Sequence, residues 1–124
     1  MILIAEDHPD TAVFLKRALE RKGYQAEIVE DGAEVLKLLS KVTPQLLILD
    51  MMMPRLSGLE VLQRMHADAH WKQIPVVVYS AGFERHQQQA AMDLGAKAYL
   101  VKGAVDLEGI FSVVEKHSTV RRAS

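Results

Sequence analysis

The segment LILDMMMPRLSG, residues 47–58, holds a single acidic side chain at the end of an apolar run. Three apolar residues directly precede Asp50, so the pattern predicts a buried strand that ends on this carboxylate. A carboxylate removed from water is costly unless it is paired, hydrogen-bonded or bound to a metal. We therefore expect Asp50 to have charged neighbours and a chemical role.

Four other side chains with useful chemistry stand in the same position, just after an apolar run. They are the acids Glu6 and Asp7 after residues 2–5, the hydroxyl of Ser80 after residues 76–79, and the ammonium of Lys102 after residues 98–101. Each residue alone is common as a helix cap, a turn residue or a solvated charge. If the runs are neighbouring parallel strands, their carboxyl ends share one sheet edge and all five side chains meet there.

Phosphoryl transfer is the chemistry that such a group of side chains can perform. Three carboxylates in one place repel one another, raise each other's pKa and favour a bound cation. Oxygen ligands suit Mg²⁺, which takes few carboxylates and keeps several waters. Beside such a cation, Asp50 can stay ionised and act as a nucleophile toward a phosphoryl group. The cation, Lys102 and Ser80 can then share the charge of the phosphoryl oxygens.

The elements that must position these side chains alternate along the chain, with apolar runs as strands and helical patterns between them. All strand segments except 26–29 are near-continuously apolar, as expected for parallel strands buried on both faces, and Glu27 marks 26–29 as an edge. This order predicts a parallel sheet covered by helices on both faces. The predicted strands are 2–5, 26–29, 46–49, 76–79 and 98–101, and the predicted helices are 9–22, 31–41, 58–67, 84–94 and 106–118.

The predicted helices carry apolar stripes and end signals. Ser57 and Asp106 suit the N-cap position, Pro9 suits a first turn, and Gly23 and Gly95 suit helix ends. The expected buried faces are Ala12, Leu15, Ala18, Leu19 and Lys22 in the first helix, Ala33, Leu36 and Leu39 in the second, Leu59, Leu62 and Met65 in the third, Ala90, Ala91 and Leu94 in the fourth, and Leu107, Ile110 and Val114 in the fifth.

Composition places the chain among ordinary globular domains. It has 124 residues, is 49% hydrophobic and 25% charged, and has a formal net charge of -1. This charge gives no basic footprint for nucleic acid or an anionic membrane, and no apolar run reaches the roughly 18 residues of a membrane span. The lack of cysteine fits a reducing compartment, and the start of the chain does not have a signal-peptide pattern. We expect a single cytoplasmic domain.

Four motifs make the chain resemble a known family. LIAEDH, LLILDMMMPRLSGLEVL, IPVVVYSA and GAKAYLVKG together resemble the receiver domain of two-component response regulators, over roughly residues 1–117. The resemblance implies a flavodoxin-like, doubly wound (βα)5 fold of class α/β, whose five parallel strands have the order 2-1-3-4-5. It also implies a receiver domain at 1–118 with a C-terminal tail at 119–124, and we expect no output domain in this chain.

The resemblance implies a role for each residue at the predicted edge. Phosphorylation would add charge of about -1.5 to -2 and three acceptor oxygens. The surface formed by residues 84–94, 98–101 and 106–118 would then change for a partner. By resemblance, Asp50 is the phosphoacceptor, and Mg²⁺ is held directly by Asp7, Asp50 and the backbone carbonyl of Met52 and through water by Glu6. Ser80 and Lys102 bind the phosphoryl oxygens, Ala81 offers space and its backbone N–H, and Tyr99 is the aromatic switch that follows Ser80.

The partners implied by the resemblance are proteins. A sensor histidine kinase or a histidine phosphotransfer protein supplies the phosphoryl group, and a downstream protein binds the switched surface. No direct nucleic-acid contact and no membrane insertion are expected, and the domain is expected to be a monomer or a weak homodimer. It is not expected to be a turnover enzyme, since only self-phosphoryl transfer and autodephosphorylation are implied.

Two positions qualify the family pattern. Proline usually follows the conserved lysine across a cis peptide, whereas Gly103 follows Lys102 here. A cis bond without proline costs about 2.5–4 kcal/mol, so we predict a trans bond and a less fixed Lys102 backbone. Met52 stands two residues after Asp50 and, with Gly82, flanks the route by which water attacks in this family. Methionine cannot orient a water by a hydrogen bond, so we predict slow autodephosphorylation.

Three alternatives remain open. The chain can be a phosphorylation-independent binding module with a receiver fold, or the N-terminal receiver of a longer regulator with a DNA-binding or enzymatic output domain. A Mg²⁺-dependent phosphatase also uses an aspartyl nucleophile, but such enzymes place a second acid close after it, where this chain has Met52.

The scattered histidines lack metal-ligand spacing, and the loop around Trp71 is expected to pack against the core.

Overall fold

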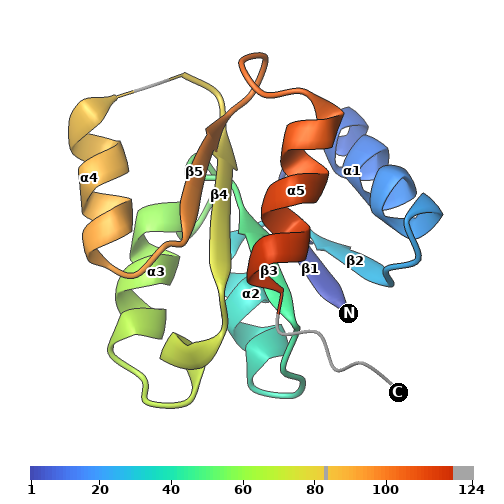
Figure 1. Ribbon diagram of the computed structural model, residues 1–124. Coiled ribbons are helices and arrows are strands. Elements are labelled where there is room, and N and C mark those ends of the chain that lie inside the picture. The colour runs from blue at the N-terminus through green and yellow to red at the C-terminus, as the bar shows by residue number, and fades with distance from the viewer. Residues whose placement is uncertain (83, 119–124) are drawn as a thin grey trace.

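The computed structural model describes residues 1–82 and 84–118, and within them strands and helices alternate as predicted (Figure 1). The helix bounds differ from the predicted ones by at most two residues at either end, and the fourth strand also includes Ser80. The predicted tail at 119–124 lies outside the described residues. The elements are β1 (Ile2–Ala5), α1 (Pro9–Arg21), β2 (Ala26–Val29), α2 (Gly32–Leu39), β3 (Leu46–Leu49), α3 (Gly58–His66), the 3₁₀ turn η1 (Trp71–Gln73), β4 (Val76–Ser80), α4 (Arg85–Asp93), β5 (Ala98–Val101) and α5 (Leu107–His117).

The strands form one parallel sheet in the order β2-β1-β3-β4-β5, which confirms the predicted flavodoxin-like topology. Helices α1 and α5 cover one face of the sheet, and α2, α3 and α4 cover the other (Figure 1). The register pairs Ala5 with Leu49, Leu49 with Val78, and Ser80 with Val101. The strands therefore end side by side at one sheet edge, which is where the predicted site residues follow.

Two apolar clusters explain why the central strands are continuously apolar. Leu3 and Ala5 face the cluster beneath α2, α3 and α4, while Ile2 and Ile4 face the one beneath α1 and α5. All four are at most 1% exposed. Because alternate side chains of a strand point to opposite faces, a strand between two helical layers needs apolar residues at every position.

The two edge strands differ from the central ones. Strand β2 is an edge, as Glu27 predicted. Strand β5 is the other edge, and its four residues are only half-buried. The prediction that this strand is buried on both faces was wrong, because β5 has a single neighbour in the sheet and α4 buries only Ala91.

Some predicted helix faces were also wrong. Lys22 is exposed because α1 ends at Arg21, and its ammonium lies 4.9 Å from the centre of the Phe111 ring. Ala33 is exposed and Val35 is buried instead, because the buried face of α2 begins at Gly32 and repeats at Val35 and Leu39.

The predicted caps are present. Ser57 forms a capping box with Glu60 at the start of α3, and the carboxylate of Asp106 accepts the N–H of Gly109 at 2.8 Å. Trp71 packs against the core as predicted, and its indole N–H donates to the carbonyl of Leu39 at 3.3 Å. Among the described residues, none of the helices has the length and apolar character needed to cross a membrane.

Candidate functional site

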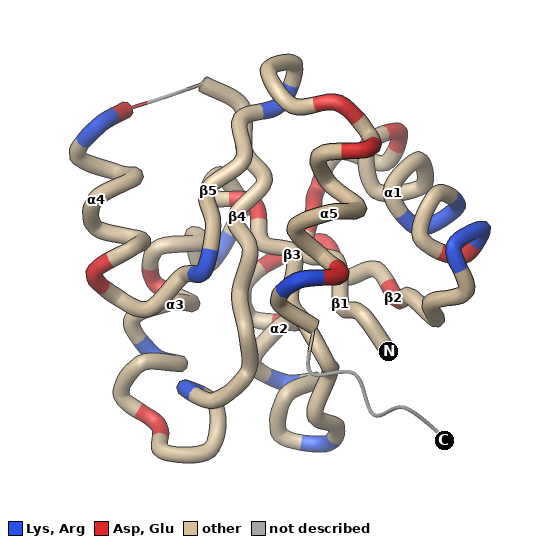
Figure 2. Tube along the Cα trace, in the orientation of Figure 1, with Lys and Arg blue, Asp and Glu red and all other residues tan. Residues whose placement is uncertain are grey.

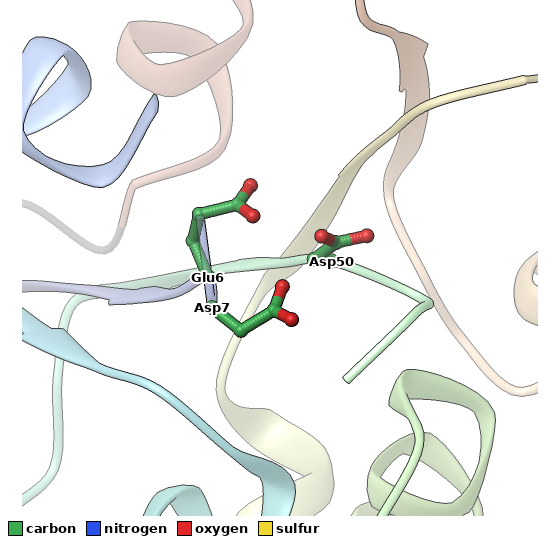
Figure 3. A group of neighbouring side chains, drawn as sticks. All are labelled: Glu6, Asp7 and Asp50. Carbon is green, nitrogen blue, oxygen red and sulfur yellow. The ribbon is translucent and has the colours of Figure 1, made fainter. Parts of the chain in front are cut away.

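Three carboxylates meet where β1 and β3 end. Figure 3 shows the side chains of Glu6, Asp7 and Asp50 converging on one another, and one oxygen from each lies within 4.8 Å of the others. Glu6 is 2% exposed and Asp50 is 5% exposed, whereas Asp7 is open to solvent. The cluster thus has two buried acids and one that solvent can reach, an arrangement of hard oxygen ligands that suits a divalent cation.

The Asp50 carboxylate is held in place by Ser80 of β4 and by the backbone of the turn that follows Asp50. Its Oδ1 accepts the hydroxyl of Ser80 at 2.9 Å and the backbone N–H of Met52 at 3.1 Å. Ser80 itself is fully buried at the end of β4. The backbone N–H of Asp50 donates to the carbonyl of Ala5, which continues the β1–β3 pairing. The Asp50 carboxylate is therefore fixed in position, while its Oδ2 contacts Lys102.

Lys102 supplies the positive charge that the buried acids need. Its Nζ lies 2.7 Å from Glu6 Oε1 and 3.3 Å from Asp50 Oδ2. Its backbone N–H donates to the Ser80 carbonyl at 2.9 Å, and its ammonium lies 5.7 Å from the centre of the Tyr79 ring. Residues from β1, β3, β4 and β5 are thus joined in one charged network.

Burial shifts the proton affinities of this network. Burial raises the pKa of Glu6; the hydrogen bond from Lys102 opposes the shift, and the nearby Asp50 adds to it. For Lys102, burial lowers the pKa, but the hydrogen bond with Glu6 and the charges of Asp50 and Glu6 outweigh this effect and raise it. Lys102 therefore stays charged, and a cation or an anion that enters must compete with these contacts.

The turn after Asp50 requires glycine at position 58. A Cβ on Gly58 would meet the backbone carbonyl oxygen of Asp50 and lie 2.6 Å from the Cα of Met51. The N–H of Gly58 donates to the carbonyl of Met51 at 3.1 Å. The first turn of α3 therefore packs directly on the backbone of Asp50 and Met51, which explains the spacing between Asp50 and Gly58.

The remaining predicted residues surround this centre. Ala81 follows β4 and is exposed, and Tyr99 is half-buried against the cluster beneath α2, α3 and α4. Burial raises the pKa of Tyr99, as do the charges of Asp50 and Glu84. Met52 is 69% exposed, so its side chain takes no part in the core. The Lys102–Gly103 bond is trans, as predicted, and Gly103 has φ 85°.

Sequence reasoning missed an ion pair beside the site. Asp31 is 5% exposed, and its Oδ2 lies 3.3 Å from Nε of Arg55, whose side chain is 74% exposed. Asp31 also caps α2, and its spacing from Glu34 was a signal that could have placed it there. Nothing in the sequence indicated that the turn after β3 would bring Arg55 to this acid.

Comparison with known proteins identifies relatives of the whole domain. A family model described as the response regulator receiver domain matches residues 2–115. Response regulator MprA from Mycobacterium sp. (strain KMS) is 36% identical over 101 residues, which make up 82% of this chain and 43% of that protein. The chain thus spans less than half the length of the curated relatives it matches.

Solved structures with the same fold include two response regulators. The Mn²⁺-bound form of response regulator Rcp1 is 25% identical, with a TM-score of 0.82 over 99% of this chain and 98% of that chain. The phosphorylated cyanobacterial phytochrome response regulator RcpA is 28% identical, with a TM-score of 0.80 over 93% of this chain and 88% of that chain.

Proposed function

The chain belongs to the response regulator receiver domain family of two-component systems, and we propose that Asp50 accepts a phosphoryl group from a phosphohistidine donor. The observation that carries the proposal is the network around this carboxylate, in which Ser80 donates to one oxygen and Lys102 pairs with the other. An oxygen of Asp50 forms a bond to phosphorus while the P–N bond of the donor breaks. The imidazole nitrogen keeps that electron pair and takes up a proton.

A divalent cation, taken to be Mg²⁺, fits the acids beside the acceptor. Glu6, Asp7 and Asp50 place oxygen ligands within 4.8 Å of one another, and the carbonyl of Met52 is the further ligand that the family pattern suggests. When bound, the cation would neutralise charge on the phosphoryl oxygens. The solved relative Rcp1 was obtained with Mn²⁺, which supports a cation of this kind here.

The switch follows from the contacts that the phosphoryl group would replace. Ser80 now donates to Asp50 and would donate instead to a phosphoryl oxygen, together with the N–H of Ala81. Lys102, now shared between Glu6 and Asp50, would pair with the added charge. Tyr99 would follow Ser80 inward and change the α4–β5–α5 surface that a downstream protein recognises.

An exposed apolar groove offers a surface for the phosphodonor protein, a sensor kinase or a histidine phosphotransfer protein. The groove lies between α1 and α5, holds about 720 Å³, and includes Val13, Phe14, Leu107 and Phe111. Val13 and Phe14 are 40% and 53% exposed, so neighbouring apolar side chains of this groove face solvent together. Helix α1 begins two residues after Asp7, so a protein seated here would reach the acids. Three basic residues, Arg17, Arg21 and Lys22, line this groove against one acid, Asp10, which would favour an acidic partner surface. Figure 2 shows the blue and red segments of α1.

We further propose that the domain does not turn over a substrate. With Met52 where a phosphatase would carry its second acid, we place the chain outside the turnover enzymes. Cytoplasmic location and protein rather than nucleic-acid partners belong to the same proposal. A silent binding module and a receiver within a longer regulator remain the competing functions.

The test is incubation with acetyl phosphate and Mg²⁺, read by intact mass. We expect the mass of one phosphoryl group on the wild type, and none on Asp50→Asn or when the cation is chelated. Equal phosphorylation of Asp50→Asn would move the acceptor elsewhere. No phosphorylation of a folded wild type would favour the silent binding module.

A further inference from the structure

The turn that follows Asp50 is tied to a different part of the molecule through Arg55. Nε of Arg55 lies 3.3 Å from Oδ2 of Asp31, a carboxylate at the start of α2 that is only 5% exposed. The other carboxylate oxygen of Asp31 accepts the N–H of Glu34 at 2.8 Å. Because this cap fixes Asp31 to the helix, the ion pair holds Arg55 against α2 and not against a mobile side chain.

Arg55 adopts a backbone conformation that costs energy. Its φ is 66°, and it is the one non-glycine residue with a positive φ in the described part of the chain. The N–H of Leu56 donates to the carbonyl of Pro54 at 2.7 Å, which closes a tight γ-turn around Arg55. Such conformations persist where surrounding contacts enforce them, and they gather at functional sites.

A second contact seats the same turn on α2. A Cβ on Gly32, in the first turn of the helix, would meet the carbonyl oxygen of Leu56 and lie 2.7 Å from its Cβ. The backbone next to Arg55 thus packs against the helix with no room for a side chain. Together, the ion pair and this close approach define where residues 54–56 lie.

The turn begins at the proposed acceptor and returns to it. Met52 donates its N–H to Asp50 Oδ1, and Gly58 donates its N–H to the carbonyl of Met51. Pro54, Arg55 and Asp31 also border a polar hollow of about 740 Å³ that Asp7 lines. The Arg55–Asp31 ion pair therefore lies on the cation side of the site. Arg55 follows two of the proposed ligands, Asp50 and Met52, in the sequence and borders the same hollow as a third, Asp7.

We propose that Arg55 is a positioning residue for cation binding: by pairing with Asp31 it holds residues 51–57 so that the Met52 carbonyl lies beside the three acids. This inference rests on the proposed function, because it assumes that these acids bind a divalent cation. If Arg55 has this role, its removal should weaken cation binding, which is the opposite of the effect expected from its charge alone. A positive side chain near a cation site repels the cation, so its removal alone would tighten binding.

The experiment measures Mn²⁺ affinity by the electron paramagnetic resonance signal of the free ion. Arg55→Ala should weaken Mn²⁺ binding by about two- to fivefold, on the order of what a largely exposed ion pair supplies. Lys37→Ala is the matched control, because Lys37 borders the same hollow and its loss removes a charge without breaking the Arg55–Asp31 ion pair. Its affinity should be unchanged or slightly higher.

A second background separates positioning from charge. Asp31→Asn keeps an oxygen to cap α2 but abolishes the ion pair, so Arg55→Ala made in that background should no longer weaken Mn²⁺ binding. Tighter or equal binding by Arg55→Ala in the otherwise wild-type protein would overturn the inference alone. A wild type that binds no Mn²⁺ would overturn it together with the cation part of the proposed function.

Discussion

The two halves of the molecule that meet at Asp50 are packed very differently. On one side, all four residues of β1 and of β3 are buried, and α3 buries Gly58, Val61, Leu62 and Met65. On the other side, the residues of β5 are half-buried and α4 buries only Ala91. Segments with few buried apolar contacts open and rearrange at low cost. We therefore expect the half that carries the acids to keep its conformation and the α4–β5 half to rearrange more easily.

The chemistry is divided along the same line. The well-packed half presents Glu6, Asp7 and Asp50, and the buried strand β4 adds Ser80, whereas Lys102 follows the half-buried β5. The contact from Lys102 to Asp50 joins the proposed acceptor to the less packed elements. A phosphoryl group inserted at Asp50 would therefore alter the contacts that reach the movable half.

Truncating one leucine in each half should show the largest difference. Leu62→Ala, at a side chain that is 2% exposed, should lower the free energy of unfolding by about 2–5 kcal/mol. Leu94→Ala, at the half-buried end of α4, should cost about 1 kcal/mol or less, because less apolar area leaves the core. Urea denaturation of both variants measures this difference. Equal costs would refute the contrast in packing.

Removing the ammonium should have the next largest effect. Lys102→Met leaves Glu6 and Asp50 buried without their cation, so at neutral pH it should lower the free energy of unfolding by about 1–3 kcal/mol. The folded-state pKa of Lys102 is raised above its ordinary 10.5. Its contribution is therefore complete below that pH and is lost as the pH rises through the folded-state value.

Denaturation of wild type and variant at several pH values checks this prediction. The gap between the two should narrow only above about pH 10.5. Lys97→Met, a change at an exposed lysine just before β5, is the control and should have little effect at any pH. A gap that stays constant into the alkaline range would contradict the role assigned to the Lys102 charge.

The smallest predicted effect concerns how long the phosphoryl group persists. The side chain of Met52 is 69% exposed beside Asp50 and offers no hydrogen bond to an attacking water. Met52→Asn should shorten the phosphoryl half-life several-fold, because an amide can orient that water. Phosphate loss after removal of the donor measures it, with Met92→Asn on α4 as the control. The idea fails if the two variants lose phosphate equally slowly.

In the well-packed half, the sequence predicted the strands and the place where the acids meet, but not which residues of α2 are buried. Continuous apolar runs identify β1 and β3, and Asp50 at the end of a run predicts where the acids meet. The periodicity of α2 gave Ala33 in place of Val35, because the face that packs is set by the seating of Gly32 on Leu56, a contact distant in sequence.

The less packed half was predicted for its residues but not for its environment. The run at 98–101 reads as a buried strand, yet β5 is an edge, and sheet position is a property of the whole topology. The Arg55–Asp31 pair was missed for a related reason. It depends on a turn with φ 66° at Arg55, and neither residue type nor periodicity predicts that conformation.

Hydrogen exchange with and without phosphorylation of Asp50 shows which half of the molecule a phosphoryl group rearranges. The protein would be treated with acetyl phosphate and Mg²⁺, with Asp50→Asn treated in the same way, and exchange would be read by mass spectrometry of peptides. We expect altered exchange in α4, β5 and the start of α5, with β1, β3 and α3 unchanged, and no difference in Asp50→Asn. Changes confined to β1, β3 and α3, or phosphorylation that alters no peptide, would contradict it.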